Sequence, residues 1–228
     1  MQFPVRLDLS LREDGRGSLR LLGEEDRPML AHEIAISHTR QVHLHLRQNS
    51  GRLGYVHLHP VPAEDGSWSF ALPPEFLAGN PGGDFQAFVD FVPVRNRRVM
   101  LAEANFRQSF ASSPDLAAVA RCRLVSVEPS TTKSGQSATI RVRLAGLEGA
   151  PLKLQPLMGS LGHAVLFGDP ATNPGYAHMH PSLEGGEYEA SPTLSFRLRL
   201  PKPGNYDFWL NINDGADQYL HYQLKVTQ

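Results

Sequence analysis

The chain has 228 residues, a length that suits one large domain or two ordinary domains. It contains 22 basic and 23 acidic residues, and the formal net charge of −1 gives no field that would favour nucleic acid or an anionic membrane surface as a partner. A single cysteine, Cys122, excludes an internal disulfide framework. No apolar run approaches the ~18–20 residues of a membrane-spanning helix, and no export signal is recognisable at the beginning of the chain.

Short runs of alternating apolar and polar residues predict strands along the first half of the chain. Residues 4–13 show this pattern clearly, because Val5, Leu7 and Leu9 alternate with polar residues, as in a half-buried strand. Turns rich in Gly, Asp, Asn and Pro separate the predicted strands that follow. These cover residues 32–36, 43–47, 55–59, 68–72, 85–92 and 98–106.

The second half of the chain predicts a comparable series of strands. The weakly periodic segment 107–119 is the best candidate for a linker, and the residues from Pro114 onward could form one helical turn. The predicted strands after it cover residues 121–127, 137–144, 163–167, 176–180, 195–200, 206–212 and 219–226. About seven short strands in each half indicate an all-β protein made of antiparallel β-sandwiches.

Two motifs recur at a constant offset in the two halves. The sequence His57-Leu58-His59-Pro60 returns 121 residues later as His178-Met179-His180-Pro181. At the same offset, residues 83–91 align with residues 204–212 and share their pattern of glycine and aromatic residues. The repeat predicts an internal duplication. We therefore assign residues 1–113 to a first β-sandwich and residues 114–228 to a second one in tandem.

The histidine motif of the second half lies in a predicted hairpin. Pairing Phe167 with Tyr176 in an antiparallel register places His163 opposite His180. Because side chains alternate faces along a strand, His163, His178 and His180 then share one face. The other face is apolar and consists of Ala164, Leu166, Ala177 and Met179.

The first half predicts an equivalent hairpin with Arg47 opposite Tyr55. One face of it contains His43, His45, His57 and His59, and the other contains Leu44, Leu46, Val56 and Leu58. We expect the aliphatic face to be buried in the core. We expect the histidines to be more accessible, because burying an unpartnered polar group costs ~1–3 kcal/mol.

Three imidazoles on one face of two strands are a typical ligand set for zinc or copper. The sequence therefore predicts one site of His163, His178 and His180 and an equivalent site of His43, His57 and His59. Met158 is a candidate fourth ligand in the second half, as are His38 or His45 in the first. The thioether favours copper, because thioethers select Cu(I). The alternative is a structural repeat whose histidines only hydrogen-bond to nearby loops.

The segments Gly162-His-Ala-Val-Leu-Phe167, Tyr176-Ala-His-Met-His180-Pro and Pro203-Gly-Asn-Tyr206 resemble the heavy-metal-binding or YtkA-like domain of bacterial extracytoplasmic proteins. The first half is similar through His43, Tyr55-Val-His-Leu-His59-Pro and Gly83-Asp-Phe85. The resemblance implies an immunoglobulin-like or cupredoxin-like sandwich that handles copper or another metal outside the cytoplasm. The chain departs from the family in lacking an export signal and in having His38 where the second copy has Met158.

Together these features favour a non-enzymatic metal-binding protein that acts as a chaperone, buffer or resistance factor, with a protein partner for metal transfer. Two alternatives stay open. The stretch Arg40-Gln-Val-His43-Leu-His45 resembles the Arg-x-x-His-x-His motif of intradiol ring-cleaving dioxygenases, which implies iron on histidines and tyrosines. A structural or interaction pair of sandwiches would need no metal, and metal analysis separates it from the other two.

Overall fold

The computed structural model describes residues 5–48, 54–111, 120–169, 175–185 and 190–228. The contacts along the chain divide it into two compact units, Met1–Ala118 and Val119–Gln228. The boundary that the sequence predicts near residue 114, and the helical turn predicted from Pro114 onward, lie outside the described residues.

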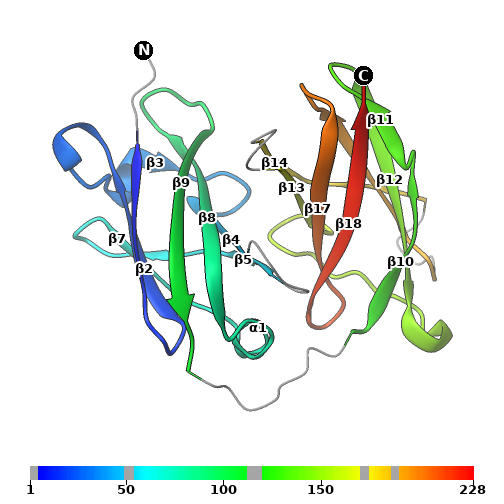
Figure 1. Ribbon diagram of the computed structural model, residues 1–228, viewed down its shortest axis with the longest axis horizontal. Coiled ribbons are helices and arrows are strands. Elements are labelled where there is room, and N and C mark those ends of the chain that lie inside the picture. The colour runs from blue at the N-terminus through cyan, green and yellow to red at the C-terminus, as the bar shows by residue number, and fades with distance from the viewer. Residues whose placement is uncertain (1–4, 49–53, 112–119, 170–174, 186–189) are drawn as a thin grey trace. The chain divides into compact units, whose positions relative to one another are not determined.

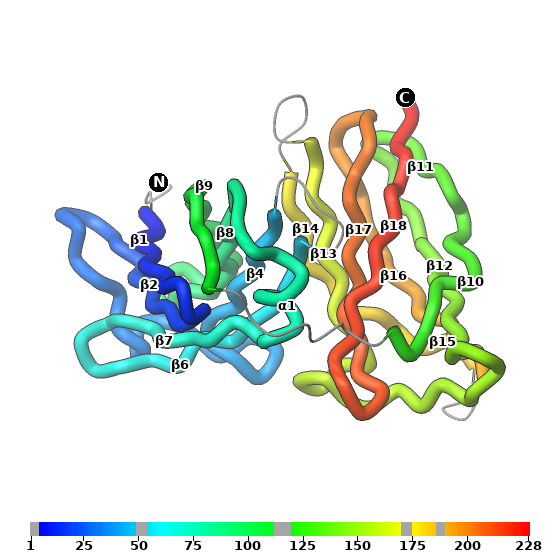
Figure 2. Tube along the Cα trace, turned by 60° about the horizontal axis from the view of Figure 1, so that its bottom comes forward, coloured from blue at the N-terminus to red at the C-terminus, as the bar shows by residue number. Residues whose placement is uncertain are grey.

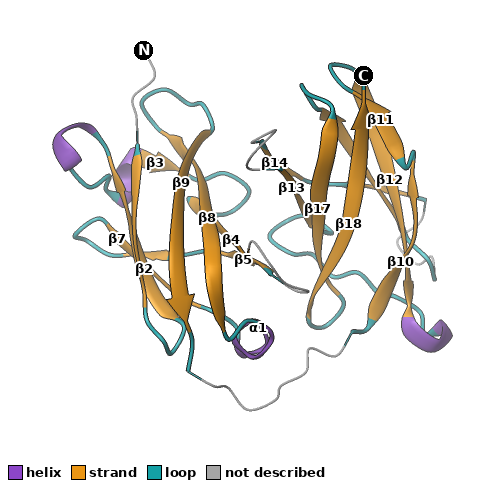
Figure 3. Ribbon diagram, in the orientation of Figure 1, coloured by secondary structure: helices purple, strands orange, loops and turns teal. Residues whose placement is uncertain are grey.

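The first unit consists of two β-sheets (Figure 1). One sheet has the order β1-β2-β7-β6 and contains β1 (Arg6–Leu11), β2 (Arg16–Leu22), β6 (Val61–Pro62) and β7 (Ser67–Ala71). The other sheet has the order β3-β8-β4-β5, and β9 also pairs with β8. This sheet contains β3 (Ile34–Ala35), β4 (Val42–Gln48), β5 (Tyr55–Leu58), β8 (Gly82–Pro93) and β9 (Met100–Ser109). The helical elements in this unit are short, namely η1 (Glu24–Asp26), η2 (Ala31–Glu33) and α1 (Pro74–Gly79) (Figure 3).

The second unit repeats this arrangement. Its first sheet has the order β10-β12-β16-β15 and contains β10 (Cys122–Glu128), β12 (Ser137–Gly146), β15 (Ser182–Glu184) and β16 (Thr193–Arg199). Its second sheet has the order β11-β18-β17-β13-β14 and contains β11 (Thr131–Lys133), β13 (His163–Gly168), β14 (Tyr176–Met179), β17 (Gly204–Asn213) and β18 (Asp217–Thr227). Figure 2 shows β14, β13, β17 and β18 in that order across one layer. The short turn η3 (Leu147–Gly149) follows β12.

The core of the second unit lies between its two sheets. Ile140 and Val142 of β12 and Phe196 of β16 pack in one cluster with Leu166 of β13 and Phe208 of β17, and all five side chains are fully or almost fully buried. Within the described residues every sheet pairing is antiparallel except the short contact of β11 with β18. The predicted all-β sandwich architecture is therefore confirmed. No helix among the described residues is both long and apolar enough to cross a membrane.

The predicted registers of both histidine hairpins are confirmed. Phe167 pairs with Tyr176 in β13 and β14, and Arg47 pairs with Tyr55 in β4 and β5. The sequence did not predict β2, β6, β11, β15 or α1. In β2 a glycine is needed at position 17, because a Cβ atom there would lie 2.8 Å from the carbonyl oxygen of Ser10 on the neighbouring strand.

Candidate metal centre

A tight turn stands just before the first histidine of each site. Residues 37–40 and 157–160 each form a two-residue hairpin turn closed by two backbone hydrogen bonds, between Ser37 and Arg40 and between Leu157 and Ser160. The central residues of both turns have positive φ: 51° at His38 and 69° at Thr39, 52° at Met158 and 78° at Gly159. Positive φ at both positions defines the type I′ turn, which follows the right-handed twist of the flanking strands.

Each turn also orients the first imidazole of its site. The Nε2 atom of His43 lies 3.0 Å from the carbonyl oxygen of Ser37, and the Nε2 atom of His163 lies 2.9 Å from that of Leu157. A carbonyl oxygen only accepts, so each Nε2 holds the proton when the ring is neutral. The Nδ1 lone pair of each ring is therefore directed away from the turn, as in metal-binding histidines that a second group orients.

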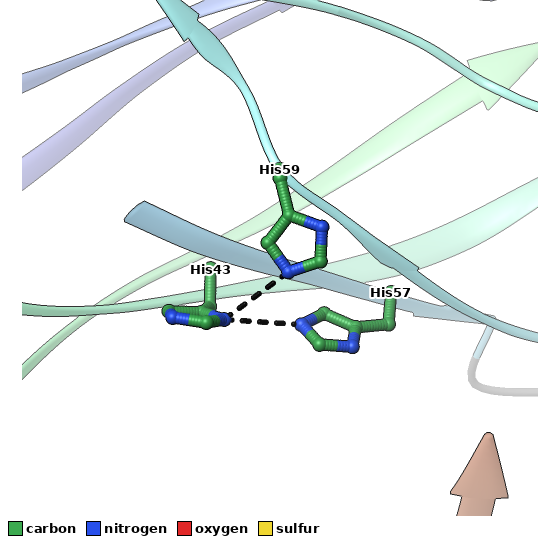
Figure 4. A group of neighbouring side chains, drawn as sticks. All are labelled: His43, His57 and His59. Atoms are coloured by element: carbon green, nitrogen blue, oxygen red, sulfur yellow. Dashed lines mark hydrogen bonds between the residues drawn. The ribbon is translucent and has the colours of Figure 1, made fainter. Parts of the chain in front are cut away.

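In the first unit the other two histidines point toward that lone pair (Figure 4). His57 and His59 lie two residues apart, and their Nε2 atoms are 3.3 Å and 3.2 Å from Nδ1 of His43. The second unit has the same arrangement, in which the Nε2 atoms of His178 and His180 are 3.2 Å and 2.9 Å from Nδ1 of His163. In each trio the nitrogen atoms lie within 4.8 Å of one another.

These separations fit a single ion held by three nitrogens. Two nitrogens bound tetrahedrally to zinc at ~2.05 Å lie about 3.3 Å apart, close to the distances in both trios. Hydrogen bonds among the three histidines alone account less well for this arrangement. The Nδ1 atom of His43 has one lone pair, yet two Nε2 atoms approach it at bonding distance. The donor set therefore suits zinc or copper and leaves a fourth position for another ligand.

His45 points to the same face of β4 but has different partners. Its Nδ1 lies 2.8 Å from the hydroxyl of Tyr55, and its Nε2 lies 3.3 Å from a carboxylate oxygen of Asp90. The His45 ring stacks on that of His57, with centroids 4.3 Å apart. The contacts place His45 beside the first trio as a neighbour that packs against a ligand.

The other two predicted ligands lie in the turns. His38 is exposed, and the centroid of its ring is 6.3 Å from that of His43. Met158 occupies the same place in the second turn and is half-buried. Among the described residues, His38 is in neither of the two trios whose nitrogen atoms converge within a unit. Ligation by His38, His45 or Met158 stays a prediction.

The prediction that the histidines are more accessible than the apolar face of the hairpin is wrong. Leu44, Leu46 and Val56 are buried, as predicted, but Leu58 is only partly buried. His43, His45 and His163 are completely buried instead of accessible. One ring nitrogen of each is within hydrogen-bonding distance of an oxygen atom of Ser37, Tyr55 or Leu157, and such a partner lowers the cost of burying the ring.

Sequence reasoning gave no role in the site to Asp90. Asp90 is the cross-strand partner of His43 between β8 and β4, and its equivalent in the second unit, Asn211, is the partner of His163. The sequence contained an indication, because Asp90 is a charged residue within the apolar run Phe88-Val-Asp-Phe91. Charged residues inside such runs are seldom buried without a partner. The carbonyl oxygens of Ser37 and Leu157 could not have been identified from residue types.

Comparison with known protein families gives one match. Residues 121–228 match the model of a domain of unknown function, DUF8832. The match lies within the second unit and covers just under half of the chain. No curated protein matches the sequence.

Several solved structures resemble the chain at low sequence identity. The filamin domain of Lin-41 is 14% identical, with a TM-score of 0.31, and the match covers 48% of this chain and 95% of that one. The Escherichia coli adhesin FdeC is 14% identical, with a TM-score of 0.31, over 100% of this chain and 66% of that one. Domains 4 and 5 of the S-layer protein SbsC are 11% identical, with a TM-score of 0.25, over the whole of both chains. Likeness at this level does not bear on function.

Proposed function

We propose that the protein binds a metal ion at each of two equivalent sites, without catalysing a reaction. The main support is the convergence of three imidazole nitrogens, present once in each unit and built in the same way both times. In both copies a backbone carbonyl sets the orientation of the first ring. Two such arrangements are harder to explain as chance neighbours than one.

Copper is the preferred ion in this proposal, and zinc is the second choice. Imidazole binds both, and Met158, in the turn before His163, would add a soft thioether donor for Cu(I) if it acts as the fourth ligand. The resemblance to YtkA-like domains implies three further points. These are a role as chaperone, buffer or resistance factor, a protein partner that exchanges the metal, and a location outside the cytoplasm. They belong to the proposal on that basis.

A structural or interaction role without metal is the rival function, and one observation favours it. The contacts within the trios, at 2.9 to 3.3 Å, are also within hydrogen-bonding distance. A buried cluster of imidazoles bonded to one another and to loops would then only stabilise each sandwich. Such a protein would be fully folded and would take up no metal.

Elemental analysis and calorimetric titration of the full chain with Zn²⁺ and with Cu(I) decide between these functions. We expect one equivalent for each trio. The variant His178→Ala/His180→Ala should lose one equivalent, and His57→Ala/His59→Ala the other. His32→Ala is the matched control, because His32 is exposed and lies in neither trio, and it should keep both. Bound iron with a visible ligand-to-metal band would favour the dioxygenase alternative.

The pH dependence provides a further test. Protons compete with metal for imidazole nitrogens, so uptake should fall as the pH drops below the ordinary imidazole range near ~6.5. A folded protein that takes up no metal at micromolar concentration and neutral pH would refute the proposal and leave the structural role.

A further inference from the structure

The two sites differ at the position beside their first histidine. Asp90 of β8 is the cross-strand partner of His43, whereas Asn211 of β17 is the partner of His163. Cross-strand partners project to the same face with Cβ atoms roughly 5 Å apart. One site therefore has a carboxylate next to its first ligand, and the other has a neutral amide of nearly the same shape.

The carboxylate in the first unit is fixed by a chain of contacts. Asp90 contacts Nε2 of His45, and Nδ1 of His45 contacts the Tyr55 hydroxyl. The contact between Nε2 of His45 and the Asp90 carboxylate, at 3.3 Å, is close enough for electrostatic attraction without being a hydrogen bond. Asp90 thus lies beside His43 across the strands and beside His45, whose ring packs against His57.

Different residues stand at the equivalent positions of the second unit. Val165 is the partner of His178 across β13 and β14, as His45 is the partner of His57 across β4 and β5. A valine cannot hold a carboxylate, and Asn211 instead donates its Nδ2–H to the carbonyl oxygen of Gln218, at 3.4 Å. Within the second unit, the cross-strand partner of the first histidine is therefore uncharged.

We propose that this difference gives the two sites different ions: Asp90 makes the first site selective for a divalent cation, whereas the second site, with Asn211 beside His163, favours Cu(I). This inference rests on the proposed metal binding. The three imidazoles are the same in both copies, so they supply affinity without discrimination. The charge of the neighbouring residue supplies the difference.

Electrostatics sets the size of the effect. For a carboxylate roughly 6 Å from an ion, at an effective dielectric constant of about 20, each unit of positive charge on the ion raises the binding constant about a hundredfold. A divalent ion gains this factor twice and a monovalent ion once. Asp90 should therefore favour a divalent ion over Cu(I) by up to about a hundredfold, reduced by solvent screening.

Reciprocal substitutions in the full chain test the inference. His178→Ala/His180→Ala leaves the first site to be measured alone, and His57→Ala/His59→Ala leaves the second. Zn²⁺ and Cu(I) affinities are measured by competition with chromophoric chelators, and folding is followed by circular dichroism. Asp90→Asn should weaken Zn²⁺ binding at the first site by tenfold or more, with a clearly smaller change for Cu(I). Asn211→Asp should strengthen Zn²⁺ binding at the second site by a similar factor.

Asp84→Asn is the matched control, since Asp84 is an exposed carboxylate on the same strand that pairs with Arg107, at 3.3 Å. It should change neither affinity. Equal losses of Zn²⁺ and Cu(I) in Asp90→Asn, or no gain in Asn211→Asp, would overturn the charge inference and leave metal binding intact. Absence of binding in both single-site backgrounds would overturn the proposed function itself. If Asp90→Asn fails to fold, Asn211→Asp alone decides the question.

Discussion

Leu46→Ala tests whether the two faces of β4 have separate roles. Leu46 is 1% exposed on the face opposite the histidines, so its truncation removes a fully buried side chain. Substitutions of this kind cost about 2–5 kcal/mol, from lost transfer free energy and the cavity that remains. Leu58 lies on the same face but is only partly buried, so Leu58→Ala should cost about 1–2 kcal/mol. Neither variant should change metal affinity.

The chain offers a clean assay for this prediction. It has two tryptophans, Trp68 in β7 of the first unit and Trp209 in β17 of the second. In a Trp209→Phe background, Trp68 fluorescence during urea unfolding reports on the first unit alone. Trp68 is 1% exposed, so its emission should shift strongly when that unit unfolds. A loss below ~0.5 kcal/mol for Leu46→Ala, or a larger loss for Leu58→Ala, would refute the assignment of the faces.

Three further predictions follow from local chemistry. The Arg27 guanidinium lowers the pKa of Glu33 to about 2. The pair therefore stabilises the fold above the unfolded pKa near ~4.3, and this stabilisation is lost as the pH falls toward 2. The variant E33Q should lack this acid-dependent loss of stability in urea unfolding. Burial raises the pKa of the Cys122 thiol to about 11, so Ellman's reagent should label it at pH 8 only after unfolding. Gly159→Thr should destabilise the second unit by about 1–2 kcal/mol, and Thr39→Gly should stabilise the first, because φ is positive at both positions; thermal unfolding measures both.

The local elements of the fold were predictable because short-range patterns determine them. Alternation of apolar and polar residues identified most strands, and the matching of polar and apolar faces was enough to predict the register of both hairpins. The strands that escaped prediction are mostly very short or contain a glycine. The alternation over two or three residues, as in Val61–Pro62, is too brief to distinguish a strand from a loop.

The candidate site was predictable in its histidines but not in its surroundings. The spacing of His57, in β5, and His59, which follows the end of that strand, was sufficient to predict that both rings lie near His43. The role of Asp90 depends on the pairing of β4 with β8, which are far apart in the chain, and that of Ser37 depends on a backbone carbonyl that residue types do not reveal. The expected accessibility of the histidines failed for the same reason, since their burial depends on partners that the sequence does not reveal.

The way the first ligand is oriented explains how the two copies could diverge around a common trio. A backbone carbonyl holds the ring of His43, and another holds that of His163, so no side chain outside the trio is needed to direct either Nδ1. Neighbouring positions can then change from Asp90 to Asn211, or from His45 to Val165, without disturbing the geometry of the ligands. Under the proposed function, such changes would alter the charge near a bound ion while the three ring nitrogens stay in place. A duplicated domain built in this way can acquire two metal preferences from a single ligand set.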